Sequence, residues 1–154
     1  MTVLIVLGSK SDKKVGDKAA DILSQFGVKS KMVVASAHRS PEYLHEEIEK
    51  SDARIIIAVA GLSAALPGVV AAKTTRPVIG VPVSGKVNLD SILSIVQMPP
   101  GIPVAAVGLD RGENAAILAV EILALSDRSL VEKLEQHRNK LKEWIIEDSK
   151  SIGD

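Results

Sequence analysis

The stretch Val3-Leu4-Ile5-Val6-Leu7, followed at once by Gly8, decides the fold. Five apolar residues in a row, interrupted by glycine, are typical of a short strand that is buried on both faces. Such strands occur mostly in parallel sheets whose two faces are covered by helices. The stretch therefore predicts an α/β fold.

The rest of the chain repeats this pattern of a strand followed by a helix. Strands are expected at residues 3–7, 29–35, 54–60, 77–83 and 102–108, and helices at 12–26, 41–50, 63–72, 89–97 and 113–125. This alternation predicts a three-layer, doubly wound parallel sheet with right-handed crossovers. A five-stranded flavodoxin-like sheet is the simplest arrangement, and the pattern leaves the strand order open.

A final helix, at residues 129–150, is surplus to the fifth strand–helix unit. With 154 residues we expect a single domain, divided into an α/β core (1–126) and this C-terminal helix (127–154). The helix at 113–125 is apolar nearly all round and needs cover on more than one face. The last helix could pack on its own domain or on a neighbouring subunit. We favour the second interpretation, which predicts a homo-oligomer.

The composition excludes several classes of function. The formal net charge is zero and the chain has only three aromatic residues, which argues against nucleic-acid binding. There is no cysteine, no pair of histidines at metal-ligand spacing and no G-x-S-x-G motif. No apolar run is long enough to span a membrane, so a cytoplasmic protein is expected.

The stretch from Val33 to Glu42 joins a strand to a helix and carries the best candidate for proton transfer. Ligands of open parallel sheets bind beyond the carboxyl ends of the strands, and this is such an end. His38 could exchange a proton near neutral pH, and Arg39 offers a planar fork that suits phosphate. A histidine bound by the backbone of a turn is the competing interpretation.

Three other strand ends carry unusual loops. Residues 8–12 combine a glycine with two hydroxyls before a helix N-terminus, which fits either an anion site or simple helix capping. The small residues at 60–68 would let a ligand lie against the main chain, or would only form a tight turn. The polar loop at 82–88 is either a lid or a solvated loop.

Together these loops resemble the PurE family of purine biosynthesis, over most of the chain. The motifs that carry the resemblance are GSKSD at 8–12, SAHRSP at 36–41, the segment 64–68, GVPV at 80–83, DSILSIVQMP at 90–99 and GIPV at 101–104. The resemblance implies a flavodoxin-like subunit, usually in an octamer, whose C-terminal helix reaches a neighbour. It implies no metal or organic cofactor.

The resemblance also implies a substrate, an aminoimidazole ribonucleotide with a 5′-phosphate, and a set of site residues. His38 would be the catalytic acid and base. Ser9 and Arg39 would hold the phosphate and Asp12 the ribose hydroxyls. The other residues expected to bind substrate are Ser11, Ser36, Ala37, Gly61, Ser63, Ala64 and Leu66.

Two branches of the family remain open. Mutases move a carboxylate from the exocyclic nitrogen of N5-carboxyaminoimidazole ribonucleotide (N5-CAIR) to ring carbon C4, and carbon dioxide stays trapped between the two steps. Direct carboxylases use free carbon dioxide and the unmodified aminoimidazole ribonucleotide. Ala65 occupies a position where many mutases have a histidine, whereas Arg39 and the segment at 94–99 resemble the mutase branch. We favour the mutase; a non-catalytic nucleotide-binding domain is the alternative from another class.

Overall fold

A computed structural model describes residues 2–152. Its centre is a parallel sheet of five strands in the order β2-β1-β3-β4-β5, which is the flavodoxin-like order. The strands are β1 (Val3–Leu7), β2 (Ser30–Val34), β3 (Ile55–Ala60), β4 (Val78–Pro82) and β5 (Ala105–Ala106). The helices are η1 (Lys10–Asp12, a 3-10 helix), α1 (Lys13–Gln25), α2 (Pro41–Lys50), α3 (Leu66–Ala71), α4 (Asn88–Val96), α5 (Gly112–Ala124) and α6 (Arg128–Ile152). The predicted fold class is confirmed.

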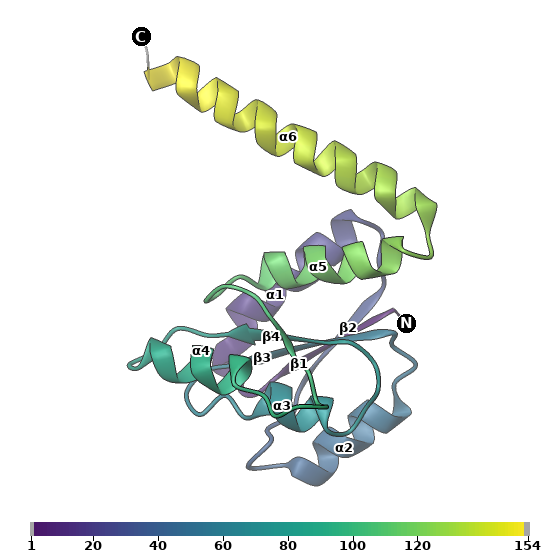
Figure 1. Ribbon diagram of the computed structural model, residues 1–154, viewed down its shortest axis with the longest axis vertical. Helices are drawn as coiled ribbons and strands as arrows, with labels where there is room; N and C mark the ends of the chain where they lie inside the picture. The colour runs from purple at the N-terminus through teal and green to yellow at the C-terminus, as the bar shows by residue number, and fades with distance from the viewer. Residues whose placement is uncertain (1, 153–154) are drawn as a thin grey trace. The chain divides into compact units, whose positions relative to one another are not determined.

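Helices cover both faces of the sheet, as the unbroken apolar strands require. Figure 1 shows α2, α3 and α4 on one face and α1 with the start of α5 on the other. Every residue of β1, β3 and β4 is buried. Because side chains alternate along a strand, Leu4 and Val6 join one core with Leu44 and Val70, whereas Ile5 between them faces the opposite layer.

Two glycines let helices approach closely. A Cβ on Gly112 would overlap the backbone oxygen of Val15, so only glycine allows α5 to begin against α1. A Cβ on Gly80, in β4, would lie 2.5 Å from Cγ2 of Ile95 in α4. Both contacts depend on the missing side chain.

The two outer strands differ from the sequence-based prediction. The expected strand at 102–108 is wrong in extent, because only Ala105 and Ala106 pair with β4, and both are exposed. Pro103 has no N–H to donate, which keeps the preceding chain out of the ladder. The strand expected at 29–35 is one residue shorter at each end, and as β2 it pairs only with β1 and exposes three of its five residues.

The helix expected from residue 63 begins later, at Leu66. Ser63 has a φ of 50°, a left-handed conformation that a helix does not tolerate. Residues 61–65 therefore form an irregular loop that leads from β3 into α3.

The chain divides into two compact units, one ending at Ala119 and one beginning at Val120. The second unit contains the end of α5 and the whole of α6, and within it Arg138 of α6 donates a 2.8 Å hydrogen bond to Glu121. Within residues 2–152, no helix is both long and apolar enough to cross a membrane.

Candidate active site

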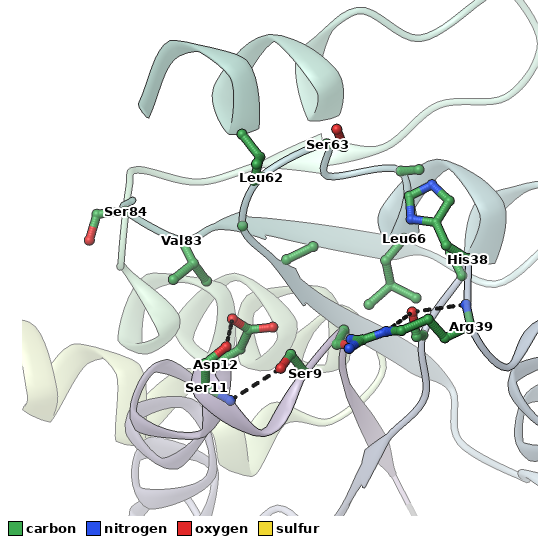
Figure 2. Close-up of a pocket in the computed structure, with 16 residues that line it drawn as sticks. Ser9, Ser11, Asp12, His38, Arg39, Leu62, Ser63, Leu66, Val83 and Ser84 are labelled. Carbon is green, nitrogen blue, oxygen red and sulfur yellow. Dashed lines mark hydrogen bonds between the residues drawn. The ribbon is translucent and has the colours of Figure 1, made fainter. Parts of the chain in front are cut away.

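A cleft of about 480 Å³ opens beyond the carboxyl ends of the strands. Loops that follow β1, β2, β3 and β4 line it, which is where a flavodoxin-like sheet binds ligands. The lining residues are Gly8, Ser9, Ser11, Asp12, Ser36, Ala37, His38, Arg39, Ala60, Gly61, Leu62, Ser63, Ala65, Leu66, Val83 and Ser84. Figure 2 shows His38 and Arg39 on one side of the cleft, with Val83 and Ser84 across from them.

The loop after β1 places two hydroxyls and a carboxylate on the floor of the cleft. The Ser9 hydroxyl accepts a hydrogen bond from the Ser11 amide (3.4 Å), and the Ser11 hydroxyl donates to Oδ1 of Asp12 (3.3 Å; Figure 2). Asp12 precedes α1, but its side chain makes no capping hydrogen bond to the helix. The carboxylate is therefore available to a ligand rather than used to cap its own helix.

Asp12 is the most deeply buried charged group of the site, with 6% of its surface exposed. Burial raises the pKa of Asp12, while the hydrogen bond from Ser11 and the positive charge of Arg39 act in the opposite direction. A buried carboxylate that is only partly compensated gains from a ligand that brings hydrogen-bond donors, and ribose hydroxyls are such donors.

Arg39 is held across the ends of two neighbouring strands. Its Nε donates to the Ser36 hydroxyl (3.3 Å), and its Nη2 donates to the carbonyl oxygen of Gly8 (3.0 Å). The Ser36 hydroxyl also accepts from the Arg39 amide, and the Ser36 amide donates to the Ser40 hydroxyl. A guanidinium has five N–H donors, so several remain for an anion in the cleft.

His38 is exposed at the edge of the cleft. Among residues 2–152, none forms a hydrogen bond with its imidazole. A histidine at a turn could have been bound by the backbone, but this one is not. Both ring nitrogens can therefore exchange protons with a bound ligand.

Gly61 and Ser63 of the loop after β3 line the cleft together with Leu66, the first residue of α3, whereas Ala64 does not. Ala64 is 1% exposed and belongs to the core beneath the loop. The amide of Ser63 donates to Oδ2 of Asp90, at the start of α4. This bond ties the loop to a helix that does not itself line the cleft.

Ten of the eleven site residues expected from the sequence thus meet in one cleft. Six further residues line it: Gly8, Ala60, Leu62, Ala65, Val83 and Ser84. Their position at the ends of β1, β3 and β4 is the signal that could have found them. Within residues 2–152, no group of three or more histidine, aspartate or glutamate side chains is placed to hold a metal ion.

Comparisons with known proteins agree with the resemblance of the loops. The family model described as AIR carboxylase matches residues 2–144. A curated N5-carboxyaminoimidazole ribonucleotide mutase from Methanocaldococcus jannaschii is 54% identical over 151 residues, which cover 97% of this chain and 96% of that protein. The Bacillus subtilis protein of the same name is 44% identical and covers 96% of each chain.

A solved structure extends the agreement to three dimensions. The crystal structure of Treponema denticola PurE superimposes with a TM-score of 0.87 at 29% sequence identity, covering 97% of both chains. Fold, strand-end motifs and near-complete alignment all point the same way: the chain belongs to the AIR carboxylase family, as its likeness to PurE proteins predicted.

Proposed function

We propose that the protein is an N5-carboxyaminoimidazole ribonucleotide mutase of purine biosynthesis, an isomerase that converts N5-CAIR into 4-carboxyaminoimidazole ribonucleotide. One observation carries the proposal: a single cleft gathers an unengaged imidazole, a guanidinium and a buried carboxylate in a chain 54% identical to a curated mutase. The first group suits proton transfer, and the other two suit a ribose phosphate.

Ser9 and Arg39 hold the 5′-phosphate in this proposal. Arg39 is fixed by Gly8 and Ser36, so its remaining donors keep a defined direction. Asp12 accepts hydrogen bonds from the ribose hydroxyls, with Ser11 beside it. The base then lies between His38 and the loop after β3, against Gly61 and Leu66.

His38 acts as both acid and base. The carbon–nitrogen bond of the N-carboxylate breaks to release carbon dioxide, and the imidazolium gives a proton to the exocyclic nitrogen. Ring carbon C4 then attacks the carbon dioxide and a carbon–carbon bond forms. The neutral imidazole removes the proton from C4, which restores the aromatic ring and the starting protonation of His38.

The cleft must also retain carbon dioxide between the two steps, because escape would uncouple them. Ala37, Ala65 and Leu66 give it apolar walls near His38. Ala65 has no titratable group, so no second histidine lines the cleft at this position. In this proposal His38 alone moves the proton.

The protein is proposed to work as a cytoplasmic homo-oligomer, with α6 packed on a neighbouring subunit in an octamer. Exposed apolar side chains along α6 support this arrangement: Leu141, Trp144, Ile145, Ile146 and Ile152. Covering apolar side chains of this size with a second protein surface is energetically favourable.

A two-substrate assay on the purified protein tests the proposed reaction. One reaction contains freshly made N5-CAIR; the other contains the uncarboxylated ribonucleotide with dissolved carbon dioxide. Fast formation of the C4-carboxylate in the first reaction alone is the expected result. Efficient turnover in the second at modest carbon dioxide would make the protein a direct carboxylase. Binding without turnover in either would make it a nucleotide-binding domain.

A further inference from the structure

Asp110 follows β5 and lies outside the lining of the cleft, yet its backbone is in an unusual conformation. Its φ is 60°, and among the non-glycine residues of the described chain only Asp110 and Ser63 have a positive φ. Aspartate tolerates the left-handed region better than most residues, but the conformation still carries a cost. A strained backbone conformation persists only where the surrounding contacts hold it in place.

Three hydrogen bonds converge on Asp110 from two other segments. Its amide donates to the carbonyl oxygen of Pro82, the last residue of β4 (2.8 Å). Its Oδ1 accepts from the amide of Ser84 (2.8 Å), and its carbonyl oxygen accepts from Nζ of Lys18 in α1 (3.0 Å). Asp110 therefore connects the end of β4 to the helix that follows Asp12.

The loop after β4 has few other contacts to hold it. Residues 84–89 are all exposed, whereas Val83 still donates to the carbonyl oxygen of Ala60 in the adjacent strand (2.9 Å). The ladder ends there, and the next amide, that of Ser84, is bound by the Asp110 carboxylate instead. Farther along the loop, Gly85 donates to the side chain of Asn88.

The Asp110 carboxylate suits this role electrostatically. Burial alone would raise its pKa, but the hydrogen bonds from Ser84 and the charges of Lys18 and Arg111 outweigh burial and lower the pKa of Asp110. The group is thus an anion at neutral pH, and a hydrogen bond to an anion is stronger than one to a neutral acceptor.

We infer that Asp110 is a positioning residue for the proposed reaction, which holds Val83 and Ser84 as the wall of the cleft opposite His38. This inference rests on the proposed function. Figure 2 shows these two residues across the cleft from the imidazole. Asp110 does not line the cleft, so it acts through Ser84. Displacing the reacting ring of the substrate by about one ångström greatly lowers the rate of reaction, so a loosened wall should slow turnover.

Two substitutions separate the carboxylate from the backbone. Asp110→Gly adopts a positive φ without strain and keeps both backbone hydrogen bonds, but it removes the acceptor of Ser84. Asp110→Asn keeps a carbonyl oxygen at the same place and also tolerates a positive φ. If the hydrogen bond to Ser84 matters, Asp110→Gly should lose activity and Asp110→Asn should retain it.

The experiment measures kcat and KM with N5-CAIR, the thermal midpoint, and amide hydrogen exchange of Ser84. We expect Asp110→Gly to lower kcat/KM at least tenfold at a similar midpoint, with faster exchange at Ser84. Asp110→Asn should stay within about threefold of the parent. A kcat/KM within twofold of the parent for Asp110→Gly, or an equal loss in Asp110→Asn, would overturn the inference.

The exchange measurement keeps the two proposals apart. In the parent protein the Ser84 amide should exchange slowly, and rapid exchange there would overturn the role of Asp110 even if Asp110→Gly failed to fold. Absence of turnover in the parent would instead defeat the proposed function. The exchange rates of Ser84 would still decide whether Asp110 holds the loop.

Discussion

Nη2 of Arg39 donates a 3.0 Å hydrogen bond to the carbonyl oxygen of Gly8, thirty-one residues earlier in the chain. The bond joins the loop after β2 to the loop after β1, which are neighbours because β1 and β2 pair in register. It fixes the direction of the guanidinium before any ligand arrives. A fixed guanidinium loses less side-chain entropy when it binds a phosphate.

Replacing Arg39 therefore tests phosphate binding directly. Loss of charge-assisted hydrogen bonds in Arg39→Ala should cost roughly 2 kcal/mol, or about thirtyfold in KM. Arg39→Lys keeps the charge but loses the fork, so its KM should lie between those of Arg39→Ala and the parent. Steady-state kinetics with N5-CAIR make the measurement. A KM unchanged in both variants would remove Arg39 from the site.

Asp12 should lower stability at neutral pH while it contributes to binding. Its pKa is raised by burial, so between the unfolded value and the folded value the folded chain binds more protons than the unfolded chain. The free energy of unfolding therefore falls as pH rises through that window. At pH values above the window, the destabilisation caused by the buried charge is fully present.

Asp12→Asn removes this cost. We expect a higher thermal midpoint than the parent at pH 7, and no difference below about pH 3, where the carboxyl is protonated in both the folded and the unfolded state. KM should rise about tenfold as the acceptor for the ribose hydroxyls weakens. Asp17→Asn, at an exposed position paired with Lys13, is the control and should not raise the midpoint. A midpoint at pH 7 that does not exceed the parent's would contradict the argument.

Gly80 and Gly85 form a matched pair for testing the packing of α4 on the sheet. A Cβ on Gly80 would lie 2.5 Å from Ile95 and 3.2 Å from Pro67, whereas a Cβ on Gly85 would meet nothing within 4 Å. Gly80→Ala should therefore lower the free energy of unfolding by about 1–3 kcal/mol, and Gly85→Ala should change it little. Denaturant titration measures both, and equal effects would show that α4 can shift to make room.

Much of this architecture follows from apolar runs and strand ends. The bounds of β1 and α2 match the prediction residue for residue, because an unbroken apolar run and a Ser-Pro-Glu helix start are strong local signals. Glycine at residue 27 has a φ of 74° and ends α1 as expected. The carboxyl ends of parallel strands meet at one edge, so the site residues could be gathered without knowing the strand order.

Local signals could not find what depends on distant contacts. The length of β5 depends on how it pairs with β4, and the exposure of β2 depends on its position at the end of the sheet. The positive φ of Ser63 accompanies a hydrogen bond to Asp90, twenty-seven residues later. Asp110 and Ser84 are likewise far apart in sequence, and no periodic pattern connects them.

Deleting the residues after Ser126 tests the proposed role of α6 in assembly. The exposed apolar side chains of α6 are expected to be covered by a neighbouring subunit, so the truncated protein should form a smaller assembly or lose solubility. Light scattering coupled to gel filtration gives the mass. Removing only residues 153–154, which carry none of these apolar side chains, is the control and should leave the number of subunits in the assembly unchanged. A truncated protein that keeps the parent's subunit number would exclude α6 from the interface.

His38→Asn is the decisive test of the chemistry, because asparagine can hydrogen-bond but cannot exchange a proton near neutral pH. The imidazole makes no hydrogen bond to residues 2–152, so the fold and thermal midpoint should persist. General acid–base catalysis contributes about 10²–10⁴-fold, and kcat should fall by at least the lower figure. His45→Asn is the matched control, since His45 lies on α2 beside Glu49 and outside the cleft. A folded His38→Asn protein with full kcat would require another proton donor, and no other histidine lines the cleft among the described residues.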